Sequence, residues 1–205
     1  VAFDGDTTQI NVMSQGEVET VDTSGVVGQH AGFAPLWLFT HPTALTRPGD
    51  KVRGLASELI GRDTADIGVL HELSVKVLDA LPYVKGETDA VTSAEAALEG
   101  EGGVCQDHAQ IFCAAARLLN FPARYVSGYL LVDEEGTQEA GHAWAEAHVD
   151  GLGWVGFDVS NQISPDERYV RVATGLDYAE AAPIHGLRLG AGVTETLSVD
   201  IQVQQ

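Results

Sequence analysis

The spacing of apolar side chains predicts two long helices in the middle of the chain. Between residues 64 and 81, apolar side chains recur three or four positions apart, which is typical of the buried face of an amphipathic helix. A second strongly helical run extends from Cys105 to about Leu119, and Phe121-Pro122 ends it. The buried stripe of this second helix consists of Ala109, Phe112, Cys113, Ala116 and Leu119.

Two shorter helices are expected before Cys105. Asp50 is placed to cap a helix that ends at Gly61. Thr92, with Glu95 three residues later, has the pattern of a capping box for a helix that closes before Gly100.

Alternation of apolar and polar residues predicts strands on both sides of these helices. Residues 1–30 are rich in Val, Thr and Ile, and we expect antiparallel strands there. The alternation returns over residues 123–132, 141–149 and 153–159, and a last strand is expected over residues 195–203. Helices followed by antiparallel strands indicate an α+β fold in which the Cys105 helix packs on the sheet.

The same patterns divide the chain into two regions. An N-terminal β segment and an extended, proline-containing connection make up residues 1–48, and a single core is expected over residues 49–205. Because Val1 already lies in strand-like sequence, we interpret the first region as the remnant of a longer N-terminal β region.

The charge of the chain limits its classes of partner. Lys and Arg total 11 against 30 Asp and Glu among 205 residues, a formal net charge of −19. Such a surface repels phosphate backbones and anionic lipids, which argues against nucleic-acid and membrane binding. No apolar run reaches the ~18 residues of a membrane helix, and no signal-peptide pattern is visible. The negative charge favours basic substrates or reflects a generally acidic proteome. The sequence leaves the oligomeric state open.

Two cysteines, Cys105 and Cys113, are expected on one helix. A rise of roughly 1.5 Å per residue separates them by about 12 Å, too far for a disulfide, which needs Cα atoms within about 7 Å. Two free thiols fit a reducing compartment, and we expect a cytoplasmic protein. Cys113 lies inside the apolar stripe and is expected to be a small core residue.

Cys105 differs from Cys113 because it opens its helix directly after Gly102-Gly103-Val104. A thiol at a helix N-terminus lies near about half a positive elementary charge, which favours the thiolate. The unpaired N–H groups of the first turn are also available to a developing oxyanion. The sequence therefore makes Cys105 a candidate nucleophile.

His142 and Asp158 lie on two consecutive predicted strands. The alanines after His142 should share the core face with Val155 and Phe157, and the three-residue loop that starts at Asp150 then places Asp158 opposite Trp144. Asp158 thus falls on the same face as His142, one diagonal step away, within reach of long side chains. Cys105, His142 and Asp158 then have the chemistry of a nucleophile, a general base and an orienting acid.

Other chemistries have less support. Cys105 and His108 could place two metal ligands on one helix face, but a closed zinc site needs about four, and no second pair has the required spacing. The run Asp133-Glu134-Glu135 lacks the spaced ligands of a calcium loop and is expected at a hairpin tip. We expect no metal and no cofactor.

Several segments resemble the bacterial transglutaminase-like superfamily. The likeness covers residues of about 64–190 and lies in three ordered motifs: Gly103–Ala109 around the cysteine, Gly141–Trp144 around the histidine and Gly153–Asp158 before the aspartate. The stretches Phe121–Leu130 and Arg171–Tyr178, with Pro183 and Gly186, follow the same pattern. The sequence departs from it at Val159-Ser160, where a proline and a threonine are frequent, and at Leu176, where an arginine is common.

The resemblance implies a papain-like α+β core in which Cys105, His142 and Asp158 are the nucleophile, base and orienting residue. It implies acyl chemistry on peptide or glutamine amides through a thioester that water or an amine resolves. Gln106 or Trp144 could assist at the oxyanion. Trp144, Trp154 and Tyr129 could line a cleft or could simply pack. The resemblance does not choose between peptidase, amidase and transglutaminase. It also leaves open whether calcium is needed, and a non-catalytic peptide-binding or scaffold member of the fold is the alternative.

Overall fold

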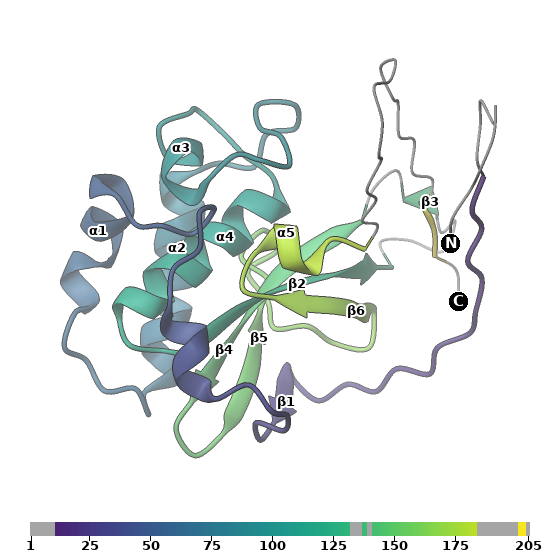
Figure 1. The fold of residues 1–205 in the computed structure, drawn as a ribbon, viewed down its shortest axis with the longest axis horizontal. Helices are drawn as coiled ribbons and strands as arrows, with labels where there is room; N and C mark the ends of the chain where they lie inside the picture. The colour runs from purple at the N-terminus through teal and green to yellow at the C-terminus, as the bar shows by residue number, and fades with distance from the viewer. Residues whose placement is uncertain (1–10, 132–136, 139–140, 184–200, 204–205) are drawn as a thin grey trace.

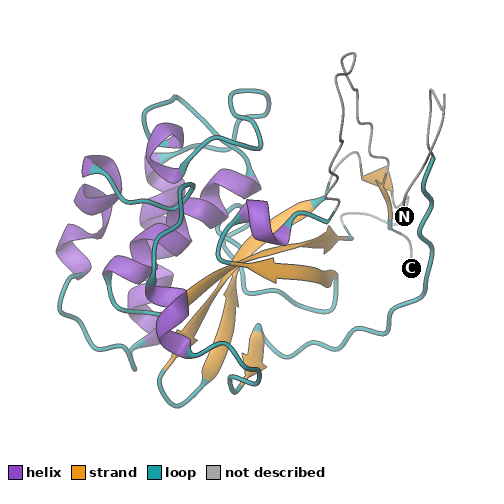
Figure 2. Cartoon of the chain, in the orientation of Figure 1, coloured by secondary structure: helices purple, strands orange, loops and turns teal. Residues whose placement is uncertain are grey.

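The computed structural model describes residues 11–131, 137–138, 141–183 and 201–203. Most of the helices lie on one side of the molecule and the strands on the other (Figures 1 and 2). The helices, in chain order, are η1 (Leu36–Thr40, 3-10), α1 (Asp50–Ala56), η2 (Ser57–Leu59, 3-10), α2 (Ile67–Ala80), α3 (Ala94–Ala97), α4 (Cys105–Leu118) and α5 (Tyr178–Ala181).

The main sheet has five strands in the order β1-β5-β4-β2-β6, and every neighbouring pair is antiparallel. A separate pair joins β3 to β7. The strands are β1 (Val26–Gly28), β2 (Ala123–Leu130), β3 (Thr137–Gln138), β4 (His142–Val149), β5 (Gly153–Phe157), β6 (Tyr169–Gly175) and β7 (Ile201–Gln202).

The core lies between α4 and the sheet. Nearly every residue of α4 after its first turn is buried, and the alanines of β4 join its apolar side chains in the main cluster. A smaller buried cluster is made by Val126, Leu130, Trp144 and Tyr169. The alternation of β4 therefore separates two buried environments, one with α4 and one with β6. The predicted α+β fold, with the Cys105 helix packed on an antiparallel sheet, is confirmed.

The two long helices predicted from apolar spacing are α2 and α4. The short helices differ from prediction at their first residues. Asp50 is the first residue of α1 rather than its cap, and the carboxylate of Glu95 accepts hydrogen bonds from the N–H groups of Gly49, Lys51 and Val52 at 2.7–3.1 Å. Ser93, not Thr92, caps α3. The expected capping box is wrong because Glu95 is used between helices rather than within its own.

The N-terminal strand prediction is wrong for most of the described residues. Residues 11–23 form no strand, and Figure 1 shows them as an extended purple segment outside the sheet. Only Val26–Gly28 pairs, with β5. Alternation allows a strand, but the strand forms only where a neighbour supplies hydrogen bonds. The expected hairpin tip at 133–135 lies outside the described residues. Residues 195–200 of the last predicted strand also lie outside them. Strand β6 was not predicted from alternation.

Candidate active site

Cys105 is the first residue of α4, and two glycines explain how the chain reaches it. A Cβ on Gly102 would lie 2.5 Å from the Cβ of Val84, and one on Gly103 would lie 2.7 Å from Cδ2 of Leu81. Only glycine therefore lets the segment before α4 approach residues 81–84 this closely. The thiol of Cys105 is partly exposed, at the positive end of a helix of fourteen residues.

The side chain of Asp107 holds the start of α4 in place. Its Oδ2 accepts hydrogen bonds from the N–H of Val104 at 2.8 Å and from the hydroxyl of Thr88 at 2.6 Å. The N–H groups of Cys105 and Gln106 lie in the first turn and have no carbonyl partner within the helix. The helix start thus presents a thiol together with backbone donors.

His142 is the first residue of β4, at the end of the sheet. The register between β4 and β5 pairs Ala145 with Phe157 and Ala147 with Val155, as the loop length predicts. One step further, Asp158 leaves the strand and pairs its backbone with Ile163. The Nε2 of His142 donates to Oδ2 of Asp158 at 2.6 Å. The structure therefore brings these two side chains into direct contact.

The side chain of Cys105 also interacts with His142 and favours the charged form of its ring. His142 therefore interacts with both the thiol and the carboxylate. Burial alone would lower the pKa of His142, but the hydrogen bonds to Asp158 and Cys105 and the charges of both raise it to about 9. The imidazolium is therefore the stable form at neutral pH.

Asp158 is fully buried and heavily hydrogen-bonded. Besides His142, its Oδ2 accepts from the hydroxyl of Tyr169 at 2.7 Å and from Nδ2 of Asn161 at 2.7 Å. Burial raises the pKa of this carboxyl, but the bonds to His142, Tyr169 and Asn161 outweigh it and hold the pKa below its ordinary value. Asp158 thus stays ionised in the protein interior.

Neither Tyr169 nor Asn161 was found from the sequence as a site residue. Tyr169 comes from β6, whose pairing with β2 has no local signal. Asn161 lies three residues after Asp158, and an Asp followed closely by Asn is a common turn pattern that could have indicated it. Gly128 pairs with His142, and a Cβ there would lie 2.5 Å from Cη2 of Trp144. This glycine gives the indole room beside His142.

The weaker candidates lie at different distances from this centre. The amide of Gln106 donates to the carbonyl of Asp89 at 3.3 Å. Trp144 is buried, with its ring 6.3 Å from that of His142. Trp154 lies four residues before Asp158 on β5, where Arg124 stacks on its ring at 4.0 Å and His30 accepts from its Nε1 at 3.1 Å.

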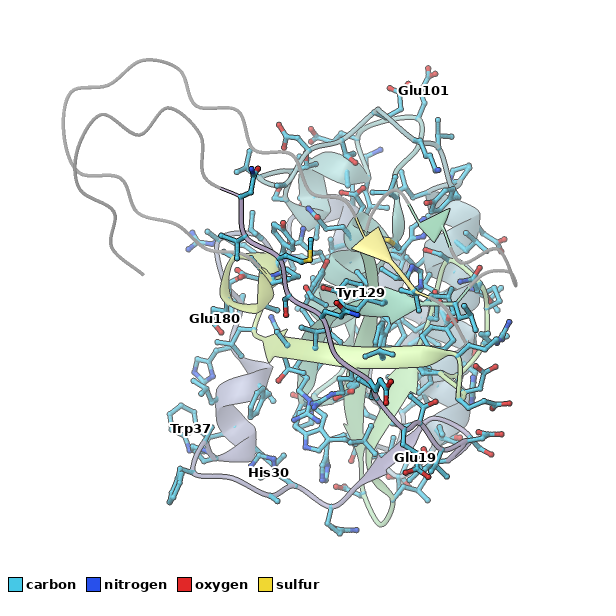
Figure 3. All side chains as sticks on the ribbon, turned by 90° about the vertical axis from the view of Figure 1, so that its right-hand side faces the viewer. Glu19, His30, Trp37, Glu101, Tyr129 and Glu180 are labelled. Carbon is cyan, nitrogen blue, oxygen red and sulfur yellow. The ribbon has the colours of Figure 1, made fainter. Side chains whose placement is uncertain are left out.

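Figure 3 helps to separate these two regions. His30, which marks the surroundings of Trp154, lies well below Tyr129, the neighbour of the glycine that pairs with His142. Tyr129 is partly buried on β2. The surroundings of Trp154 and the end of the sheet that carries His142 are thus distinct places in the fold.

The remaining candidates have other partners. Both nitrogens of the buried His108 ring are engaged, Nδ1 with Ser160 and Nε2 with the carbonyl of Leu81, each at 2.8 Å. Cys113 is fully buried, and both cysteines are free thiols, as their helical spacing predicts. Within the described ranges, no group of three or more His, Cys, Asp or Glu is placed to hold a metal ion. In the same ranges, no helix has the length and apolar character needed to cross a bilayer.

The fold and this site define a class of protein, an α+β domain in which a helix N-terminus presents a thiol beside a histidine–aspartate pair. The profile of the transglutaminase-like superfamily matches residues 53–159, just over half of the chain. The chain therefore belongs to the transglutaminase-like superfamily.

Two mycobacterial relatives share part of this sequence. This chain is 35% identical over 128 residues to the uncharacterized protein ML0607 of Mycobacterium leprae. The match covers 60% of this chain and 45% of the relative. The chain is also 31% identical over 147 residues to the uncharacterized protein Rv2569c of Mycobacterium tuberculosis. That match covers 67% of this chain and 47% of the relative. The chain thus spans about half the length of the curated relatives it matches.

Among solved structures, the chain is similar to the crystal structure of a candidate cysteine protease from Cytophaga hutchinsonii. The two share 27% identity with a TM-score of 0.62, over 80% of this chain and 55% of the other. This likeness agrees with a papain-like α+β core.

Proposed function

We propose that this chain is a cysteine hydrolase or acyltransferase that acts on peptide or glutamine amides. The observation that carries the proposal is the position of His142, bonded through Nε2 to Asp158 at 2.6 Å and interacting with the side chain of Cys105. An imidazole held between a thiol and a buried carboxylate is the arrangement that activates a sulfur nucleophile. Members of the superfamily act on peptide or protein substrates, which supports the substrate class.

The proposed mechanism follows from the roles of the three side chains. The Cys105 sulfur attacks the amide carbonyl carbon as a thiolate whose proton is held by His142, and a C–S bond forms while the carbonyl electron pair moves to oxygen. The His142 imidazolium then gives its proton to the leaving amine as the C–N bond breaks, which leaves a thioester on Cys105. Asp158 keeps the imidazole oriented and stabilises its charge throughout. Water or an amine, deprotonated by His142, resolves the thioester.

The first test measures the reactivity of Cys105 toward iodoacetamide across pH. We expect fast labelling near neutral pH in the wild type and its loss in His142→Ala. His148→Ala is the matched control, because His148 lies on the same strand but at its other end. Labelling that rises only near pH ~8.5, the ordinary pKa of a free thiol, would contradict the proposal.

The second test decides the acceptor. The protein is incubated with a peptide library in the presence and absence of a primary amine, with Cys105→Ala as the control. Incorporation of the amine indicates a transglutaminase, and cleavage alone indicates a hydrolase. Peptide retained without turnover indicates the alternative, a non-catalytic peptide-binding member of the family. Because the reaction needs a reduced thiol and both cysteines are free, we also propose a reducing compartment such as the cytoplasm.

A further inference from the structure

The segment that follows α2 is hydrogen-bonded to the segment that precedes α4, at a place close to Cys105 in the sequence. The N–H of Val84 donates to the carbonyl of Gly103 at 2.7 Å, and the N–H of Gly103 donates to the carbonyl of Pro82 at 3.1 Å. These two bonds form a parallel bridge between Tyr83 and Gly103. Tyr83 is therefore fixed beside a residue only two positions before Cys105.

The two glycines allow this close pairing. The room that Gly102 and Gly103 leave is filled by Val84 and Leu81, the neighbours of Tyr83 in sequence. The ring of Tyr83 also lies 6.1 Å from that of His108, which is held by hydrogen bonds at both nitrogens. Backbone pairing and ring contact thus place Tyr83 independently of each other.

The hydroxyl of Tyr83 is available to a substrate. The residue is 46% exposed, and its hydroxyl makes no hydrogen bond to any residue in the part of the chain that the structure describes. Partial burial, then the charges of Cys105 and Asp158, raise the pKa of Tyr83, so the phenol keeps its proton at neutral pH. The hydroxyl thus lies within electrostatic reach of both groups and remains a donor.

The other side-chain donors near Cys105 are engaged or enclosed. The amide of Gln106 is directed to the carbonyl of Asp89. Trp144 is only 2% exposed and packs with Val126, Leu130 and Tyr169. Of these three side chains, Tyr83 is the one with an exposed donor that lacks a hydrogen-bond partner among the described residues.

We propose that Tyr83 is a catalytic residue whose O–H donates a hydrogen bond to the substrate carbonyl oxygen as Cys105 attacks. The inference rests on the proposed function and adds a residue to it. As the C–S bond forms, the carbonyl π pair moves to oxygen, and Tyr83 stabilises this oxyanion together with the N–H groups of the first turn of α4. The phenol keeps its proton throughout, and the proton for the leaving group comes from His142.

The experiment compares Tyr83→Phe with the wild type in two reactions of the same sulfur. p-Nitrophenyl acetate acylates Cys105 through an oxyanion and is followed by the burst of p-nitrophenolate. Iodoacetamide alkylates Cys105 by displacement of iodide, without attack on a carbonyl. We expect the saturating acylation rate to fall about 10²-fold, the usual effect of removing one oxyanion donor. We expect the alkylation rate and the half-saturating ester concentration to stay within about twofold, because binding and nucleophile are untouched.

The controls separate the possible failures. Tyr178→Phe removes a hydroxyl from α5 and should leave both rates unchanged. Equal acylation by Tyr83→Phe and wild type would overturn this inference alone. Parallel loss of acylation and alkylation would also overturn it, since Tyr83 would then act through the structure around Cys105. If the wild type shows no burst beyond that of Cys105→Ala, the proposed function fails and the inference falls with it.

Discussion

At the scale of single residues, the site depends on a chain of short hydrogen bonds. Tyr169 and Asn161 donate to the carboxylate of Asp158, which in turn accepts from His142. Each donor stabilises the charged form of Asp158, and that charge stabilises the imidazolium. The protonation state of His142 is therefore set in part by Asp158 and its partners, in addition to Cys105.

Asp158→Asn should lower the pKa of His142 from about 9, because burial then acts without the opposing charge. A hydrogen-bonded carboxylate shifts a neighbouring pKa by roughly 1–3 units, so we expect a fall of at least about 1 unit. NMR titration of the imidazole measures it. Asp150→Asn, at the far end of β4, is the control.

The same shift predicts a pH dependence of stability. The pKa of His142 rises on folding, so protonation of His142 stabilises the folded protein. This contribution to the free energy of unfolding is fully present below about pH 6.5 and is lost as pH rises through about 9. Asp158→Asn should weaken this loss in urea unfolding. An equal decline in stability between these pH values in both proteins would contradict the assignment.

At the scale of elements, close approach between neighbouring strands positions His142. Gly128 on β2 lies opposite His142 on β4, and the ring of Trp144 covers it. A side chain at this position would also meet the backbone carbonyl of Val170 on β6. Three strands thus meet where no Cβ can be placed without a shift of buried atoms.

Gly128→Ala should destabilise the protein by about 1–3 kcal/mol, the usual cost of overpacking a buried site. Urea unfolding followed by circular dichroism measures the change. Gly54→Ala is the control, because Gly54 is exposed on α1 with no atom within 4 Å of an added Cβ. That variant should gain up to about 1 kcal/mol from helix propensity. Unchanged stability in Gly128→Ala would contradict this prediction, because it would show that β6 shifts to accept the added Cβ at little cost.

At the scale of the whole molecule, one packed core unites segments far apart in the chain. Arg117 of α4 donates to the carbonyls of Phe39, Ala123 and Leu176, so it links the N-terminal connection to the turn before α5. Strand β1 completes one edge of the same sheet. Access to the interior, including Cys113, should therefore require global rather than local opening.

Thiol counting checks this cooperativity. In the native protein at pH ~8, we expect a disulfide reagent to modify Cys105 only, because Cys113 is fully buried and burial raises its pKa to about 12. Both thiols should react in urea. In Cys105→Ala, the labelling of Cys113 should follow the unfolding transition. Rapid reaction of both thiols in the native wild type would contradict the prediction.

Local patterns were enough to predict the two long helices and the pairing of β4 with β5. The alanine face of β4 and the short loop after it admit one register, and that register brings Asp158 to His142. They were not enough for residues 11–23, where the alternation is present but the chain forms no strand. The cap of α1 was also missed, because Glu95 comes from a different helix.

The sequence by itself determined that Cys105 opens a helix and that His142 and Asp158 share one face of adjacent strands. Period and loop length are local quantities, and both can be counted along the chain. Only the tertiary structure decided which side chains surround these three. Tyr169 reaches Asp158 because β6 pairs with β2, and Tyr83 lies beside Gly103 because two glycines admit a distant segment. Such contacts depend on how separate segments pack, which no local pattern records.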